Sequence, residues 1–110
     1  MITKTYVTSE QGTVAQVCFE LPNSLWATTV HLVGDFNEWD HKSHQFGLDN
    51  EGRWTITIEL ETGRIYQFRY LLDACEWMND GAADGYVSNH YGGDNGLVIT
   101  DPDFHPHIES

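Results

Sequence analysis

The sequence contains few basic residues, few cysteines and no long hydrophobic segment. Five Lys and Arg side chains stand against 17 Asp and Glu side chains, so the formal net charge is −12 over 110 residues. Binding to nucleic acid or to an anionic membrane requires a basic surface, which this composition does not supply. We therefore expect neither nucleic acid nor a membrane as a partner.

The absence of long apolar runs bears on location. No run approaches the roughly 18–20 apolar residues that a membrane span needs. Residues 1–6 show no hydrophobic stretch of a secretory signal, so we expect a cytoplasmic protein. Cys18 and Cys75 do not form a metal-type pair, and in a reducing compartment we expect free thiols. A disulfide between them stays open as the alternative.

Length and composition fit one folded domain. Domains commonly contain about 100–150 residues, and an apolar fraction of 40% with 13% aromatic residues is too high for a disordered chain. We expect a β-sandwich domain over residues 13–100. Residues 1–12 form an N-terminal segment that could add an edge strand, and residues 101–110, with two prolines and no period, form an irregular tail.

Alternation of apolar and polar residues predicts β-structure along most of the chain. From Arg53 to Leu60 every second residue is apolar, as in a half-buried strand. The run 65–72 alternates in the same way, and the turn residues 61–63 join the two runs as a hairpin. Further strands are expected at 13–21, 28–33 and 96–100.

The run 65–72 assigns its side chains to two faces. The inward set is Tyr66, Phe68, Tyr70 and Leu72, and the outward set is Gln67, Arg69 and Leu71. Short strands separated by turn residues, without a helical period over ten or more residues, are typical of a two-sheet sandwich or a barrel. We predict an all-β sandwich.

Two tryptophans lie outside the alternating runs. Trp39 follows a predicted strand in a polar turn, and Trp77 lies in the stretch 73–95, which is rich in Gly, Asn and Asp and is predicted as a long functional loop. A tryptophan in a polar loop either covers the edge of the core or forms a platform for a ligand. The outward-facing Arg69, between the two in sequence, favours the platform.

Sugars suit an aromatic platform for a physical reason. A pyranose ring has an apolar face of C–H groups and a rim of hydroxyls. An indole covers the apolar face, while polar side chains and backbone groups bind the rim.

Four segments in the same order and spacing carry a resemblance to a known family. They are VHLVGDFNEWD (30–40), GRWTITIEL (52–60), YQFRYLLD (66–73) and YGGDNGLVI (91–99). With these segments the sequence is similar, over residues 13–100, to carbohydrate-binding module family 48, the isoamylase N-terminal or glycogen-binding domains. This family includes the N-terminal domains of branching enzymes and the glycogen-binding domain of the β subunit of AMP-activated protein kinase.

The resemblance implies an early-set, immunoglobulin-like β-sandwich of about seven strands, with no catalytic residue and no cofactor. It implies binding of α-1,4-glucans such as glycogen, starch or maltooligosaccharides. By similarity, Trp39 and Trp77 stack on glucose, while Arg69 and Asn95 hydrogen-bond to hydroxyls. Tyr91 lies where the kinase subunit has a leucine that inserts into a curved oligosaccharide.

Two positions depart from the family pattern. Ala74 stands where the family favours glycine, and type I′ turn geometry is costly for alanine. The sequence therefore allows a different turn and a different aim of Trp77. Gly93 stands where the kinase subunit offers a threonine hydroxyl. Many enzyme-attached members of the family serve as spacers, so the fold alone does not establish sugar binding.

Other functions stay as alternatives. The chain could be a protein-interaction or spacer module that recruits or dimerises with a glycan-metabolising enzyme, or a hydrolase with two carboxylates in a cleft. The candidates for metal binding are weak, because they match no known ligand spacing. They are the pair His41 and His44, the pair His105 and His107, and the calcium set Asp80, Asp84 and Asp94.

Overall fold

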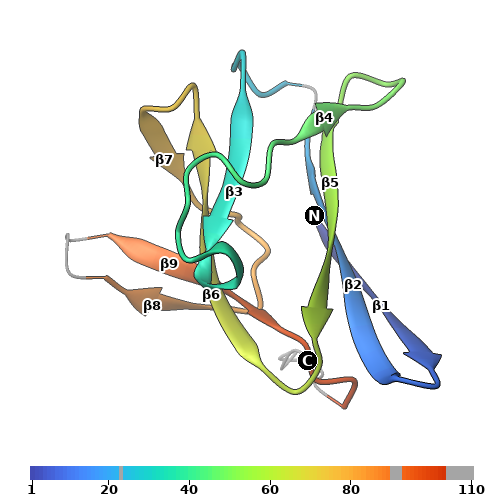
Figure 1. The fold of residues 1–110 in the computed structure, drawn as a ribbon. Helices are drawn as coiled ribbons and strands as arrows, with labels where there is room; N and C mark the ends of the chain where they lie inside the picture. Colours follow the sequence, from blue (N-terminus) through green and yellow to red (C-terminus); the bar gives the residue numbers. More distant parts are fainter. Residues whose placement is uncertain (23, 90–92, 104–110) are drawn as a thin grey trace, which may run out of the picture.

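A computed structural model of the chain describes residues 1–22, 24–89 and 93–103, and within these ranges the fold is all-β (Figure 1). One antiparallel sheet has the strand order β1-β2-β5-β4, and the other has the order β3-β6-β9-β8, with β7 paired to β6. The strands are β1 (Ile2–Ser9), β2 (Gly12–Leu21), β3 (Val30–Gly34), β4 (Gly47–Leu48), β5 (Trp54–Glu61), β6 (Ile65–Leu72), β7 (Glu76–Met78), β8 (Gly85–Ser88) and β9 (Asp94–Ile99).

The predicted two-sheet β-sandwich is confirmed. The described part of the chain has nine strands where about seven were expected, and the strands that the sequence did not predict are β4, β7 and β8, with two, three and four residues. Strands this short carry too few residues for a period of two to show in the sequence. No helix in the described ranges is long and apolar enough to cross a membrane.

Alternate side chains from both sheets form the core. Val17 and Phe19 of β2 and Phe68 and Tyr70 of β6 are each 0% exposed. The Phe19 ring lies edge-on to Phe68, with 5.2 Å between ring centroids, and to Tyr70 at 6.4 Å. Trp54, predicted to face inward, is also buried. The period of two therefore identified the core correctly.

The outer face of β6 is covered where it meets β3 and β7. Leu71 belongs to the outer face, as predicted, but is only 2% exposed. Its register partners are His31 of β3 and Trp77 of β7. The fully buried Val33 lies opposite Arg69 on the same face. The five-stranded sheet thus packs side chains on both of its faces at this place.

The sequence predicted one long loop over residues 73–95, and this prediction is wrong. The stretch contains β7, which pairs with β6, and β8, which pairs with β9. A buried carboxylate ties the segment between them to the core: Asp80 Oδ2 accepts a hydrogen bond from the Tyr70 hydroxyl at 2.7 Å. Burial, reinforced by the charge of Asp80, raises the pKa of Tyr70 and keeps the phenol a proton donor.

The turn between β6 and β7 keeps type I′ geometry despite its alanine. Asp73 and Ala74 both have left-handed backbones, with φ of 53° and 59°, and the Cys75 N–H donates to the Leu72 carbonyl at 3.0 Å. The Asp73 carboxylate accepts both main-chain N–H groups of residues 28–29, at 2.7 and 3.0 Å. These bonds hold the turn, so the aim of Trp77 does not require glycine.

Replacing this alanine with glycine is expected to stabilise the domain. A left-handed backbone costs an L-residue about 1–2 kcal/mol, whereas glycine adds about 0.4–1 kcal/mol of chain entropy to the unfolded state. Ala74→Gly should therefore raise the free energy of unfolding, measured by urea denaturation, by about 0.5–1 kcal/mol. The control Ala82→Gly, at a turn residue without positive φ, should lower it slightly. Equal effects of the two changes would contradict the assignment of strain to Ala74.

Candidate functional site

One cavity on the outer face of the five-stranded sheet brings together the predicted site residues that the structure describes. Its volume is about 540 Å³. Four of the five predicted site residues, Trp39, Arg69, Trp77 and Asn95, line it, and the fifth, Tyr91, lies outside the described residues. The full set of lining residues is Trp39, His41, Gln67, Arg69, Trp77, Asn89 and Asn95.

Trp39 reaches the cavity from an unusual backbone conformation. It follows a short 3-10 helix, η1 (Asp35–Asn37), and both Glu38 and Trp39 are left-handed, with φ of 57° and 60°. The main-chain N–H of Trp39 donates to the Gly34 carbonyl at 2.9 Å, and this bond closes the turn. A left-handed backbone is rare for a bulky side chain and persists only when its surroundings hold it.

Asp35 holds the indole of Trp39 against β6. Its Oδ1 accepts the Trp39 Nε1–H at 2.9 Å, and its Oδ2 accepts the main-chain N–H of Gln67 at 2.8 Å. One carboxylate therefore joins the ring to the neighbouring strand. Because the ring N–H is already bound, Trp39 has its aromatic faces left for a ligand.

The rest of the turn is fixed by Asn37 and by a close backbone contact at Gly34. Asn37 Oδ1 accepts the Gly34 N–H at 3.1 Å, and Asn37 Nδ2 donates to the Leu32 carbonyl and to His44 Nδ1, both at 2.9 Å. A Cβ atom at Gly34 would lie 2.4 Å from the Gln67 carbonyl oxygen. Only glycine allows this approach of the turn to β6.

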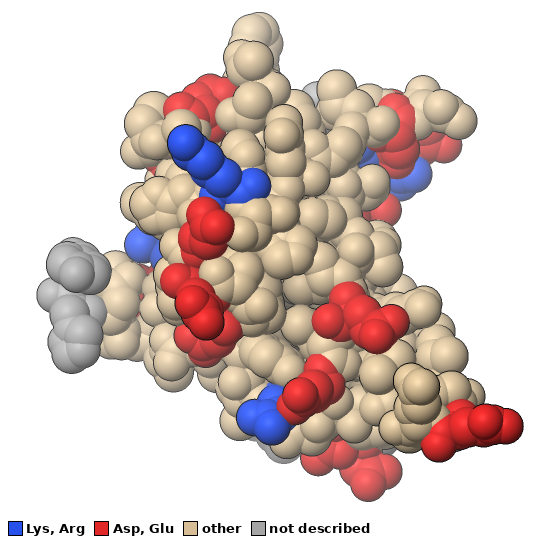
Figure 2. All heavy atoms as spheres, viewed as in Figure 1, with Lys and Arg blue, Asp and Glu red and all other residues tan. Residues whose placement is uncertain are grey.

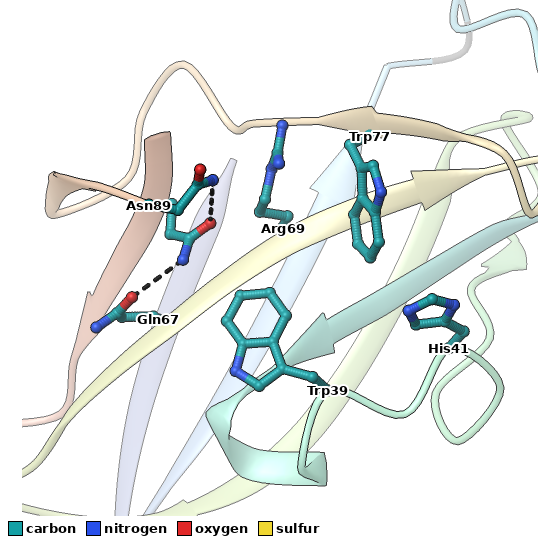
Figure 3. A pocket seen from close by; sticks show the side chains of 7 residues that line it. Trp39, His41, Gln67, Arg69, Trp77 and Asn89 are labelled. Carbon is teal, nitrogen blue, oxygen red and sulfur yellow. Dashed lines mark hydrogen bonds between the residues drawn. The ribbon is translucent and has the colours of Figure 1, made fainter. Parts of the chain in front are cut away.

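Trp77 lies between a histidine and an arginine on the other side of the cavity (Figure 3). Contrary to the sequence prediction, it lies in a strand, β7, and it is 37% exposed. The guanidinium carbon of Arg69 is 5.5 Å from the centre of its ring, a cation–π distance. The His41 ring meets Trp77 edge-on, with 5.2 Å between centroids.

None of the described residues that line this cavity is acidic, although the chain has 17 Asp and Glu side chains. On the face shown in Figure 2, carboxylates outnumber Lys and Arg side chains. Lys4, Arg53 and Arg64 each pair with a carboxylate. Arg69 has no carboxylate within salt-bridge distance in the described ranges, and its buried Nε has no hydrogen-bond partner there. Its charge therefore stays available to the cavity.

The polar floor of the cavity consists of three amides, Gln67, Asn89 and Asn95. Asn95 is 9% exposed and donates through Nδ2 to Gln67 Oε1 at 3.0 Å. Its Oδ1 accepts from Asn89 Nδ2 at 3.2 Å. The predicted Asn95 is thus the centre of a hydrogen-bonded group rather than an isolated polar residue.

Sequence reasoning missed three lining residues. Gln67 could have been found, because it lies two positions before Arg69 in the same strand and therefore on the same face. His41 was considered only as a metal ligand. His41 and Asn89 come from irregular segments, and no periodicity gives the direction of a side chain there.

The structure supplies no arrangement for a metal ion in its described part. No group of three or more His, Cys, Asp or Glu side chains there could hold one. Asp84 of the calcium set pairs instead with Lys4 at 2.6 Å. His105 and His107 lie outside the described residues. Both cysteines are free thiols.

Comparison with known families identifies the domain. The sequence profile of the family described as carbohydrate-binding module 48 (isoamylase N-terminal domain) matches residues 13–102. The match covers most of the chain, and the two-sheet sandwich agrees with it. The chain belongs to carbohydrate-binding module family 48.

Individual relatives match over shorter stretches. The 1,4-alpha-glucan-branching enzyme of Dictyostelium discoideum is 56% identical over 32 residues, which are 29% of this chain and 5% of the enzyme. The branching enzyme GlgB of Butyrivibrio fibrisolvens is 38% identical over 64 residues, 56% of this chain and 10% of the enzyme. That of Bacillus cereus (strain B4264) is 41% identical over 44 residues, 38% of this chain and 7% of the enzyme. The chain thus spans a small part of these relatives.

Removing the carboxylate that holds Trp39 is expected to destabilise this part of the domain. In Asp35→Ala the indole N–H and the Gln67 N–H lose their acceptor, so the free energy of unfolding should fall by about 1–2 kcal/mol. The near-ultraviolet circular dichroism should lose intensity as Trp39 gains freedom. The control Asp94→Ala removes an exposed carboxylate of the same charge and should change stability by less than about 0.5 kcal/mol. Equal effects in urea denaturation would contradict this role of Asp35.

Proposed function

We propose that this chain is a cytoplasmic, non-catalytic module that binds α-1,4-glucans such as glycogen, starch or maltooligosaccharides. The observation that carries the proposal is the convergence of Trp39 and Trp77 on one cavity. They come from segments 38 residues apart in sequence and meet there with Arg69 and three amides.

The cavity suits a neutral sugar in size and in chemistry. Its volume of about 540 Å³ lies in the usual range of small-ligand sites, roughly 300–1,000 Å³. Two indoles offer apolar faces for the C–H side of glucose rings. Arg69 and the amide floor around Asn95 offer hydrogen bonds to hydroxyls. Because no described residue that lines the cavity is a carboxylate, the sugar oxygens meet no charge repulsion from this lining.

The comparisons support the ligand class. The family is named for carbohydrate binding, and the matched relatives are 1,4-alpha-glucan branching enzymes. Because the matches cover 5–10% of those enzymes, we carry over the glucan as ligand and not the branching reaction.

The lining of the cavity favours binding without catalysis. Glycoside hydrolysis commonly uses two carboxylates on either side of the scissile bond, about 5–10 Å apart. None of the described residues that line this cavity is Asp or Glu. A glucan bound here would therefore not meet the acid and base that hydrolysis needs.

The proposal predicts that each cavity tryptophan contributes to affinity. Trp39→Ala and Trp77→Ala should each weaken maltoheptaose binding by about 1–3 kcal/mol, or roughly 5- to 150-fold, because each removes a stacking face. The matched control is Trp26→Ala, since Trp26 is 95% exposed and lies outside the cavity. Isothermal titration calorimetry on folded variants measures all three. Unchanged affinity in a folded Trp39→Ala variant would contradict the proposed stacking of the glucan on Trp39.

Ligand class is tested on the unaltered chain by titrating its tryptophan fluorescence. Maltoheptaose and β-cyclodextrin should give saturable changes, and cellohexaose, with β-linkages, should not. No response to any of the three in a folded sample would refute glucan binding.

A second candidate function, recruitment of a partner protein, is favoured by one separate observation. Trp26 is 95% exposed and Leu48 is 60% exposed, and neither lines the cavity. Tryptophan is enriched among the anchor residues of protein interfaces. If Trp26 mediates self-association, size-exclusion elution should shift with concentration in the native chain and not in Trp26→Ala.

A further inference from the structure

His41 belongs to the same turn as Trp39, and hydrogen bonds to Asp40 fix the main chain there. The Asp40 carboxylate accepts the Ser43 hydroxyl at 2.6 Å and the Lys42 main-chain N–H at 3.0 Å. These bonds, the one from Ser43 first, lower the pKa of Asp40, so the carboxylate stays ionised as an acceptor. A turn closed by its own aspartate in this way gives the side chain of His41 a defined direction.

The His41 ring contacts Trp77 of β7 at the side of the cavity. The two rings lie edge-to-face, with 5.2 Å between centroids and planes 81° apart, which is a favourable geometry for an aromatic pair. The guanidinium carbon of Arg69 lies 5.5 Å from the centre of the same indole. Figure 3 shows Trp77 between these two side chains. Because 37% of Trp77 stays exposed, the contacts hold the ring without burying it.

Trp77 depends on such contacts more than Trp39 does. Asp35 fixes the indole of Trp39 by accepting its N–H at 2.9 Å. Within the described ranges no hydrogen bond reaches the Nε1 of Trp77, and its ring interactions are those with Arg69 and His41. Its strand, β7, has three residues and pairs with β6. An exposed ring on so short a strand would otherwise sample several rotamers, and a ligand would have to order it.

We propose that His41 is a positioning residue of the glucan site, which orders the ring of Trp77 before a ligand arrives. The inference rests on the proposed glucan binding, and it gives a role to a lining residue for which the sequence suggested only metal binding. Trp39 and His41 belong to one turn, so a single segment fixes both stacking rings. The two indoles therefore keep a fixed relative position, and less side-chain entropy is lost when a glucan stacks on them.

Substitutions at position 41 separate the positioning of Trp77 from direct hydrogen bonding to the glucan. His41→Ala removes the ring, so maltoheptaose affinity, measured by isothermal titration calorimetry, should fall about three- to tenfold, the usual cost of ordering one side chain. His41→Phe keeps the edge-to-face contact and cannot hydrogen-bond, so its affinity should lie within about twofold of the native value. His41→Gln keeps hydrogen bonding without the ring and should bind as weakly as His41→Ala.

The matched control is Lys42→Ala, which changes the next residue of the same turn, outside the cavity. It should bind maltoheptaose like the native chain. Failure of His41→Phe to restore affinity overturns the proposal. Full affinity in His41→Ala or in His41→Gln also overturns it, because Trp77 would then need no aromatic neighbour at position 41.

A double-mutant cycle tests whether His41 acts through Trp77. If it does, adding His41→Ala to Trp77→Ala should change maltoheptaose affinity by less than about twofold, since the ring that His41 positions is already gone. If the two losses multiply, His41 contributes to binding independently of Trp77, and the proposal is wrong.

Nuclear magnetic resonance without ligand tests the positioning itself. The indole N–H signal of Trp77, assigned by its loss in Trp77→Ala, should show a lower order parameter in His41→Ala and a native one in His41→Phe. An unchanged order parameter in His41→Ala contradicts the proposal. The outcomes also separate the two claims. Weaker binding in Trp77→Ala but not in His41→Ala refutes this inference alone, and no glucan binding by the native chain refutes both.

Discussion

The alternation of side chains along β6 is the constraint on which both the core and the cavity depend. This strand pairs with β3 along one edge and with β7 and β9 along the other. Phe68 and Tyr70 fill the core, while Gln67 and Arg69 line the cavity. A slip of one residue would place Arg69 in the core and two aromatic rings outside it. Burial of the apolar side chains in the core therefore fixes the register of β6 against its neighbouring strands. The same register places the polar groups of the cavity next to one another.

Periodicity in the sequence was enough to predict the sandwich, the strand at 65–72 and the inward rings. The resemblance was enough to name Trp39, Arg69, Trp77 and Asn95, all of which line one cavity. What failed was the reading of 73–95 as a loop, because strands of three and four residues show no period. The hydrogen-bonded amides of the cavity floor were also out of reach, since they depend on contacts between β6, β9 and Asn89, which follows β8.

The charge pattern isolates the cavity from the rest of an acidic molecule. Asp35 is bonded to a lining side chain, yet both of its oxygens accept N–H groups of the protein. Arg69 stacks on Trp77 and has no carboxylate partner in the described ranges. A guanidinium held between a ring and an amide floor loses little freedom when it meets a ligand. The contacts of Asp35 and Trp77 that hold the site together thus leave the guanidinium of Arg69 without a carboxylate partner in the described ranges, so it can donate hydrogen bonds to the oxygen atoms of a ligand.

The backbone of Trp39 is better explained by ligand binding than by packing. A left-handed conformation costs on the order of 1–3 kcal/mol for each residue that holds it, and Glu38 and Trp39 both do. If a ring were needed only to cover the edge of the core, Phe36 already does so, packing 6.4 Å from Phe19 between centroids. The second ring, aimed away from the core and fixed by Asp35, adds little to the core. Its cost is accounted for if the aromatic face has a ligand to meet.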